Sequence, residues 1–104
     1  MSEESKLAAA DLVDDLAPLG DVTTKAMFGG NGVFCDGVMF VLIDREGTVY
    51  LRGDDETAAE FESLGSRRHQ PMPYWTLPAE VGDDPDRLAQ WASRSLDIAR
   101  AAKK

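Results

Sequence analysis

Residues 25–51, which read KAMFGGNGVFCDGVMFVLIDREGTVYL, decide the fold of this chain of 104 residues. Short apolar segments alternate here with glycine-containing breaks, a pattern typical of strands joined by tight turns. The dipeptide Asp36-Gly37 predicts a two-residue hairpin turn, because both central positions of a type I′ turn require positive φ. The unbroken apolar run of residues 38–43 predicts a central strand. The stretch therefore predicts an antiparallel meander.

The residues around that central strand predict further short strands. Residues 22–28 alternate with the period of a half-buried strand. The glycine-rich segment 29–32 predicts a tight turn after it, because glycine adopts positive φ without strain. Residues 33–35 and 48–51 predict two more strands. The residues expected on one face of the first strand are Val22, Thr24, Ala26 and Phe28.

Helical patterns lie at both ends of the chain and after residue 53. Residues 5–17 have apolar residues at helical spacing, Asp54 or Asp55 is suited to cap a second helix, and Asp84 a third. Residues 66–73 predict a loop, and residues 74–77 a fifth strand near an edge, because prolines flank it. The fold class predicted is α+β: one domain over residues 1–104, a two-layer α/β sandwich. Its antiparallel sheet has about five strands, with three helices in the order α-β-β-β-β-α-β-α. The apolar stripe expected on the last helix is Leu88, Trp91, Ala92, Leu96 and Ala99.

Composition limits the function classes. The formal net charge is −8, with 19 acidic and 11 basic residues, which disfavours direct nucleic-acid binding because such proteins neutralise phosphates with clustered Lys and Arg. The only basic clusters are small, at residues 67–69 and 103–104. The chain contains no apolar run of about 18 residues, so the sequence predicts no membrane span. The single Cys35 and the absence of a signal-peptide pattern predict a cytoplasmic protein.

No set of residues predicts catalysis, a cofactor site or a metal site. The glycines at 29–32 precede a strand rather than the helix N-terminus that a phosphate loop requires. Cys35 lies beside Asp36, which opposes formation of a thiolate. The acidic clusters at residues 54–56 and 83–86 lack the ligand spacing of a calcium loop and are placed as helix caps. We therefore expect a protein that is not an enzyme.

The segments KAMFGGNG (25–32), DGVMF (36–40) and Tyr50-Leu51, followed by Phe61 with Gly65 and by Tyr74-Trp75, resemble the N-terminal domain of the TfoX (Sxy) competence-regulator family. The resemblance covers roughly residues 5–102. It implies the two-layer architecture shared with secretion chaperones, with helices on one side of the sheet. Longer members carry a helical C-terminal domain and act as positive regulators of natural competence. This chain resembles a stand-alone, single-domain member, and its segment 66–71 is shorter than the family's.

Two hypotheses for function follow. The resemblance favours a non-enzymatic protein-interaction domain of regulatory type, connected with transcription regulation, that binds a protein partner or forms a homodimer. The alternative is a small-molecule (metabolite) binding domain with a pocket between sheet and helices, near residues 29–32 and Trp75. The candidate contacts for a partner or ligand are Lys25, Phe28, Gly29, Gly30, Gly32, Met39, Tyr74 and Trp75.

Overall fold

The fold follows the predicted order of elements, with one additional short helix. A computed structural model describes residues 3–27, 29–69 and 72–102. The helical elements are α1 (Glu3–Leu16), a 3₁₀ turn η1 (Ala17–Leu19), α2 (Asp55–Ser63), α3 (Ala79–Gly82) and α4 (Pro85–Ala102). The strands are β1 (Val22–Met27), β2 (Gly30–Cys35), β3 (Val38–Ile43), β4 (Val49–Arg52) and β5 (Tyr74–Thr76). The predicted α+β class is confirmed.

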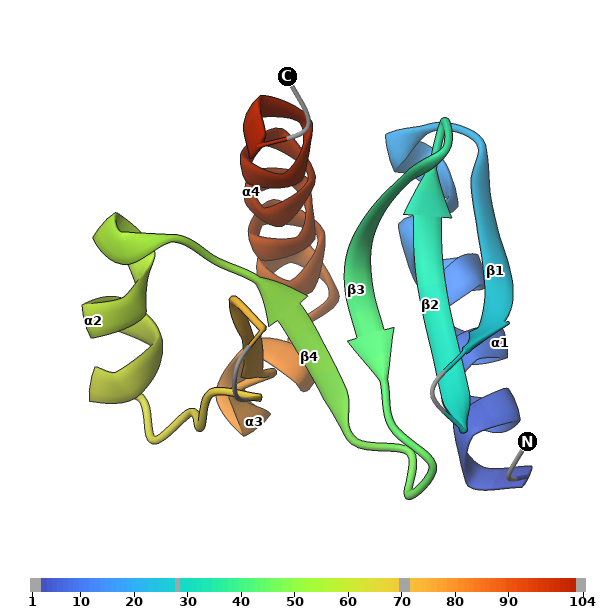
Figure 1. The fold of residues 1–104 in the computed structure, drawn as a ribbon, viewed down its shortest axis with the longest axis horizontal. Coiled ribbons are helices and arrows are strands. Elements are labelled where there is room, and N and C mark those ends of the chain that lie inside the picture. Colours follow the sequence, from blue (N-terminus) through green and yellow to red (C-terminus); the bar gives the residue numbers. More distant parts are fainter. Residues whose placement is uncertain (1–2, 28, 70–71, 103–104) are drawn as a thin grey trace.

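The five strands form one antiparallel sheet in the order β1-β2-β3-β4-β5. Helix α1 packs on β1 and β2, and α4 packs on β3 and β4, so both helices cover the same face (Figure 1). Helix α2 contacts β5, at the opposite edge of the sheet from α1. The core lies between the sheet and these helices, and its buried side chains include Leu12, Leu16, Val33, Val41, Leu51, Leu88 and Leu96.

The hairpin between β2 and β3 turns where the sequence predicts. Asp36 and Gly37 have φ of 52° and 84°, the positive values that a type I′ turn requires. Beyond the turn the register shifts, because Phe34 pairs with Met39 whereas Val33 pairs with Val41. Phe40 is therefore the extra residue of a β-bulge, and this irregularity allows Phe40 and Val41 both to be fully buried.

Of residues 29–32, which were predicted to form a turn, only Gly29 lies in one. Gly29 has a positive φ of 77°, whereas residues 30–32 belong to β2: Gly30 pairs with β1, and Asn31 and Gly32 pair with both β1 and β3. Glycine at position 30 is explained by packing, because a Cβ there would overlap the backbone carbonyl oxygen of Ile43. The second strand is consequently longer than predicted.

The prediction that β1 is half-buried was also wrong. The side chains from Thr23 to Ala26 are exposed, and only Val22 and Met27 at its ends are partly buried. Strand β1 is the edge of the sheet, and α1 packs more closely on β2, so alternation in its sequence does not correspond to a buried face. Phe28, expected to share this strand, lies outside the described residues.

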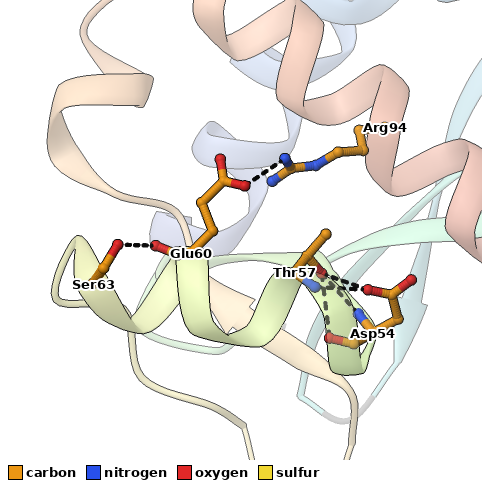
Figure 2. A network of polar contacts seen from close by, with 5 residues as sticks. All are labelled: Asp54, Thr57, Glu60, Ser63 and Arg94. Carbon is orange, nitrogen blue, oxygen red and sulfur yellow. Dashed lines mark hydrogen bonds and ion pairs between the residues drawn. The ribbon is translucent and has the colours of Figure 1, made fainter.

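The helix caps are those that the acidic clusters predict. Asp54 caps α2 in a capping box with Thr57, whose backbone N–H donates to the Asp54 carboxylate at 2.9 Å (Figure 2). Asp84 accepts hydrogen bonds from the backbone N–H groups of Asp86 and Arg87 at the start of α4. Helix α3 was not predicted because its four residues are too few to show a helical period.

An aromatic cluster and an ion pair join helix α2 to the rest of the molecule. The Phe61 ring stacks on Trp75 with centroids 5.7 Å apart and meets the edge of Trp91 at 5.2 Å. Arg94 of α4 lies over the Trp91 ring and forms an ion pair with Glu60 at 2.9 Å (Figure 2).

Across the described residues, none of the helices combines the length and apolar character needed to span a membrane.

Candidate functional site

Within the part of the chain that the structure describes, one face of the sheet has no helix packed on it. The cross-strand register places Lys25, Gly32, Leu42, Tyr50 and Thr76 in one row, and side chains in such a row point to the same face. None of these residues belongs to the core cluster that α1 and α4 close. We call this surface the open face, and define it by Lys25, Met27, Gly32, Phe34, Met39, Leu42, Tyr50, Arg67 and Thr76.

The centre of the open face is a small apolar layer over Gly32. A Cβ at Gly32 would lie 2.8 Å from the sulfur atoms of both Met27 and Met39 and 3.0 Å from the Phe34 ring. Three strands therefore contribute side chains that meet above one glycine. These three side chains are half-buried, and adjacent Leu42 is only 2% exposed although no described helix covers this face. The layer therefore covers the backbone at Gly32 with side chains of the sheet itself.

Tyr50 and His69 border this layer on the β4 side. The Tyr50 hydroxyl donates to the Asp44 carboxylate at 3.3 Å, and its ring meets the His69 ring edge-on at 4.9 Å. Burial, followed by the nearby charge of Asp44, raises the pKa of Tyr50, while Arg67 opposes the shift. The phenol therefore remains protonated at neutral pH and acts as a hydrogen-bond donor.

Charge is distributed unevenly between the two sides of the molecule. The five described strands contain no Asp or Glu but carry Lys25 and Arg52, whereas acidic residues occur in each of the helices α1 to α4. Lys25 and Arg67 are exposed on the open face, and Arg67 lies next to β5, where its carbonyl accepts from the Thr76 N–H. The open face therefore presents two exposed basic side chains, while the carboxylate of Asp44, which accepts from the Tyr50 hydroxyl, lies at its border.

The structure brings some of the predicted contact residues together and separates others. Lys25, Gly32 and Met39 lie on the open face, while Gly29 is exposed in the turn before β2. Gly30 is buried against the backbone at Ile43 and Asp44.

Tyr74 and Trp75 are 2% and 3% exposed. Trp75 belongs to the core beside Phe61 and donates its indole N–H to Glu62 at 3.3 Å. The predicted contact Phe28 is not among the described residues.

Sequence reasoning did not assign Phe34, Leu42 or Tyr50 to the face of the sheet that lacks helices. Part of this placement could be read from the sequence. A two-residue turn at Asp36-Gly37 pairs Cys35 with Val38 and therefore places Phe34 opposite Met39, on the same face. What the sequence could not supply was the identity of the face that the helices cover.

Cys35 and the acidic clusters have structural roles. The Cys35 thiol is buried, with its sulfur 3.9 Å from the Leu19 carbonyl oxygen, and burial followed by the charge of Asp36 raises its pKa. Within residues 3–27, 29–69 and 72–102, no three His, Cys, Asp or Glu side chains are grouped to hold a metal ion.

Comparison with known proteins agrees with the architecture. The family model for the TfoX N-terminal domain matches residues 14–99, and the chain therefore belongs to this family. Among characterised relatives, it is 39% identical over 59 residues to DNA transformation protein TfoX1 of Aliivibrio fischeri. The match covers 57% of this chain but only 28% of that protein, so the matched segment corresponds to little more than a quarter of the relative's length.

Proposed function

We propose that this domain is a non-enzymatic interaction module that binds a protein partner on its open face. The observation that carries the proposal is the layer of Met27, Phe34 and Met39 over Gly32, on a side of the sheet that no described helix covers. Met and aromatic side chains are enriched at protein interfaces, and the flexible thioether adapts to a partner's shape. A partner placed here would cover apolar side chains without disturbing the core.

The charge of the open face indicates the chemistry of the partner. Lys25 and Arg67 flank the apolar layer, and the strands between them carry no Asp or Glu. The carboxylate of Asp44 at the border is engaged by the Tyr50 hydroxyl and by backbone N–H groups of its own loop. Basic groups around an apolar centre complement a segment that presents apolar residues among Asp and Glu. A second copy of this chain fits less well, because face-to-face pairing would oppose like charges and join two chains of net charge −8. We therefore infer a different protein with an acidic, apolar docking segment.

Family membership indicates the process. The relative from Aliivibrio fischeri is named a DNA transformation protein, which supports a role in regulating competence. The acidic composition of this chain favours regulation through a protein partner over direct contact with DNA. We propose that it acts in the cytoplasm, where Cys35 remains a free thiol.

The test compares two charge-matched variants of the immobilised chain. Lys25→Glu with Arg67→Glu reverses charges on the open face, whereas Arg87→Glu with Arg100→Glu makes the same change in charge on α4. Proteins captured by each chain are identified by mass spectrometry, and the solution mass of each purified chain is measured in parallel.

We expect a stoichiometric partner that the wild type and the α4 variant retain and the open-face variant loses. The captured protein should contain an acidic segment that binds alone as a synthetic peptide. Equal capture by all three chains would contradict the proposal. A homodimer that the open-face variant dissociates would show that a second copy occupies this face and would overturn the acidic partner.

A further inference from the structure

Strands β3 and β4 separate near the C-terminal end of α4 and leave a cleft. Their pairing extends from Ile43–Val49 to Val41–Leu51 and stops at the bulged Phe40. Arg52, the next residue of β4, pairs only with Tyr74 of β5. Figure 1 shows the two strands diverging toward the upper part of α4, which fills the space behind them. The bulge in β3 therefore opens the sheet at one place.

Two adjoining hollows occupy this cleft. One, of about 310 Å³, has Val38 and Met39 on one wall, Arg52 and Tyr74 on the other, and Ala99 and Ala102 as its floor. The second, of about 470 Å³, shares Arg52 and Ala102 and extends to Asp54, Asp97 and Ile98. The small alanine side chains of α4 leave this space open. Volumes of roughly 300–1,000 Å³ are typical of small-ligand sites.

Arg52 is the polar group at the junction of the two hollows. Its guanidinium carbon lies 5.9 Å from the centre of the Tyr74 ring, and its Nε is buried without a hydrogen-bond partner among the described residues. A buried donor without an acceptor is costly, and the planar guanidinium matches the two oxygens of a carboxylate. The Tyr74 hydroxyl bridges the cleft to the Met39 carbonyl oxygen at 3.3 Å and fixes the wall beside Arg52.

We propose that this cleft binds a small carboxylate with a short apolar tail. Arg52 would hold the carboxylate, and the tail would lie against Val38, Ala99 and Ala102. A phosphate dianion fits less well, because Asp54 and Asp97 line the adjoining hollow and would repel a second negative charge. The carboxylate could belong to a free metabolite or to the C-terminus of a peptide. This inference does not depend on the proposed partner, although Met39 borders both sites.

The proposal is tested by NMR titration of the ¹⁵N-labelled chain with butyrate, and with uncharged butyramide as the matched control. Butyrate should shift the amide resonances of Val38, Ala99 and Ala102 saturably, and butyramide should not. Arg52→Gln should weaken butyrate binding by about tenfold or more, since hydrogen bonds to charged groups contribute this much. Arg87→Gln, which removes an exposed charge elsewhere on α4, should leave it unchanged.

A second pair of probes distinguishes the two sources of carboxylate. A short apolar peptide is compared with its C-terminally amidated form; tighter binding of the free-acid peptide than of butyrate would identify a peptide terminus. If Arg52→Gln does not fold, Ala102→Phe fills the cleft from the exposed end of α4 and should abolish the shifts. Absence of shifts with both acids, or butyrate binding unaffected by either variant, would overturn the proposal.

Discussion

The side chains on the two faces of this sheet are buried in different ways. On the core face, α1 and α4 close over side chains such as Val33 and Leu51, which are fully buried. On the open face, their immediate neighbours Phe34 and Tyr50 are half-buried, Phe34 beside the methionines over Gly32 and Tyr50 beside Asp44 and His69. One step along a strand therefore separates a residue that stabilises the fold from one that is accessible to a partner.

The largest expected difference between the faces is in stability. Leu51→Ala should lower the free energy of unfolding by about 2–5 kcal/mol, because it removes buried methyl groups and leaves a cavity under the helices. Met39→Ala, on the partly exposed layer, should cost clearly less. Denaturation in guanidinium chloride measures the free energy of unfolding of both variants. Equal losses would show that the open face is as much a core as the helix-covered face.

Two glycines of β2 differ in what a side chain added at each would meet. Gly30→Ala should destabilise the chain by about 1–3 kcal/mol, because its Cβ would overlap backbone atoms at Ile43 and Asp44 that cannot move aside. Gly32→Ala should cost less, because it would displace the ends of the flexible Met27 and Met39 side chains. Thermal unfolding of the two variants ranks the costs. The reverse ranking would mean that the layer over Gly32 is rigid.

The cap of α2 gives a medium effect that depends on pH. Asp54→Ala should cost about 1 kcal/mol at pH 7, whereas Asp54→Asn should retain most of the cap. The Thr57 backbone N–H lowers the pKa of Asp54 below its ordinary value, so its stabilisation is present above that value and is lost as pH falls through the folded-state pKa. The difference between wild type and Asp54→Asn should therefore shrink below about pH 4. A constant difference down to pH 2 would contradict this role.

The smallest effect is expected on the helical surface. Arg87→Gln breaks a pair with Glu80 at 3.6 Å whose side chains are 40% and 56% exposed, and it should change stability by less than about 0.5 kcal/mol. Added salt should remove even this difference. A larger loss of stability that persists in high salt would indicate that ion pairs stabilise the acidic helical side.

Local rules in the sequence predicted the elements but not the open face. Asp36-Gly37, the run at 38–43 and the stripe on α4 were identified because each depends on neighbouring residues only. Gly30 was misread because the reason for it is the backbone at Ile43, a contact between strands. The cleft at Arg52 depends on the bulge at Phe40, which residue spacing does not reveal. Which face the helices cover is likewise a tertiary property.

The most direct test of the open face uses its methionines as reporters. The chain is labelled with ¹³C on the methionine methyl groups and titrated with a synthetic peptide of alternating Asp and Leu, with a Lys-Leu peptide as control. We expect saturable shifts at Met27 and Met39 with the acidic peptide, and little change at Met72 in the loop before β5. Shifts at Met72 alone, equal shifts with the basic peptide, or no shifts at all would contradict the proposal that this face receives an acidic partner.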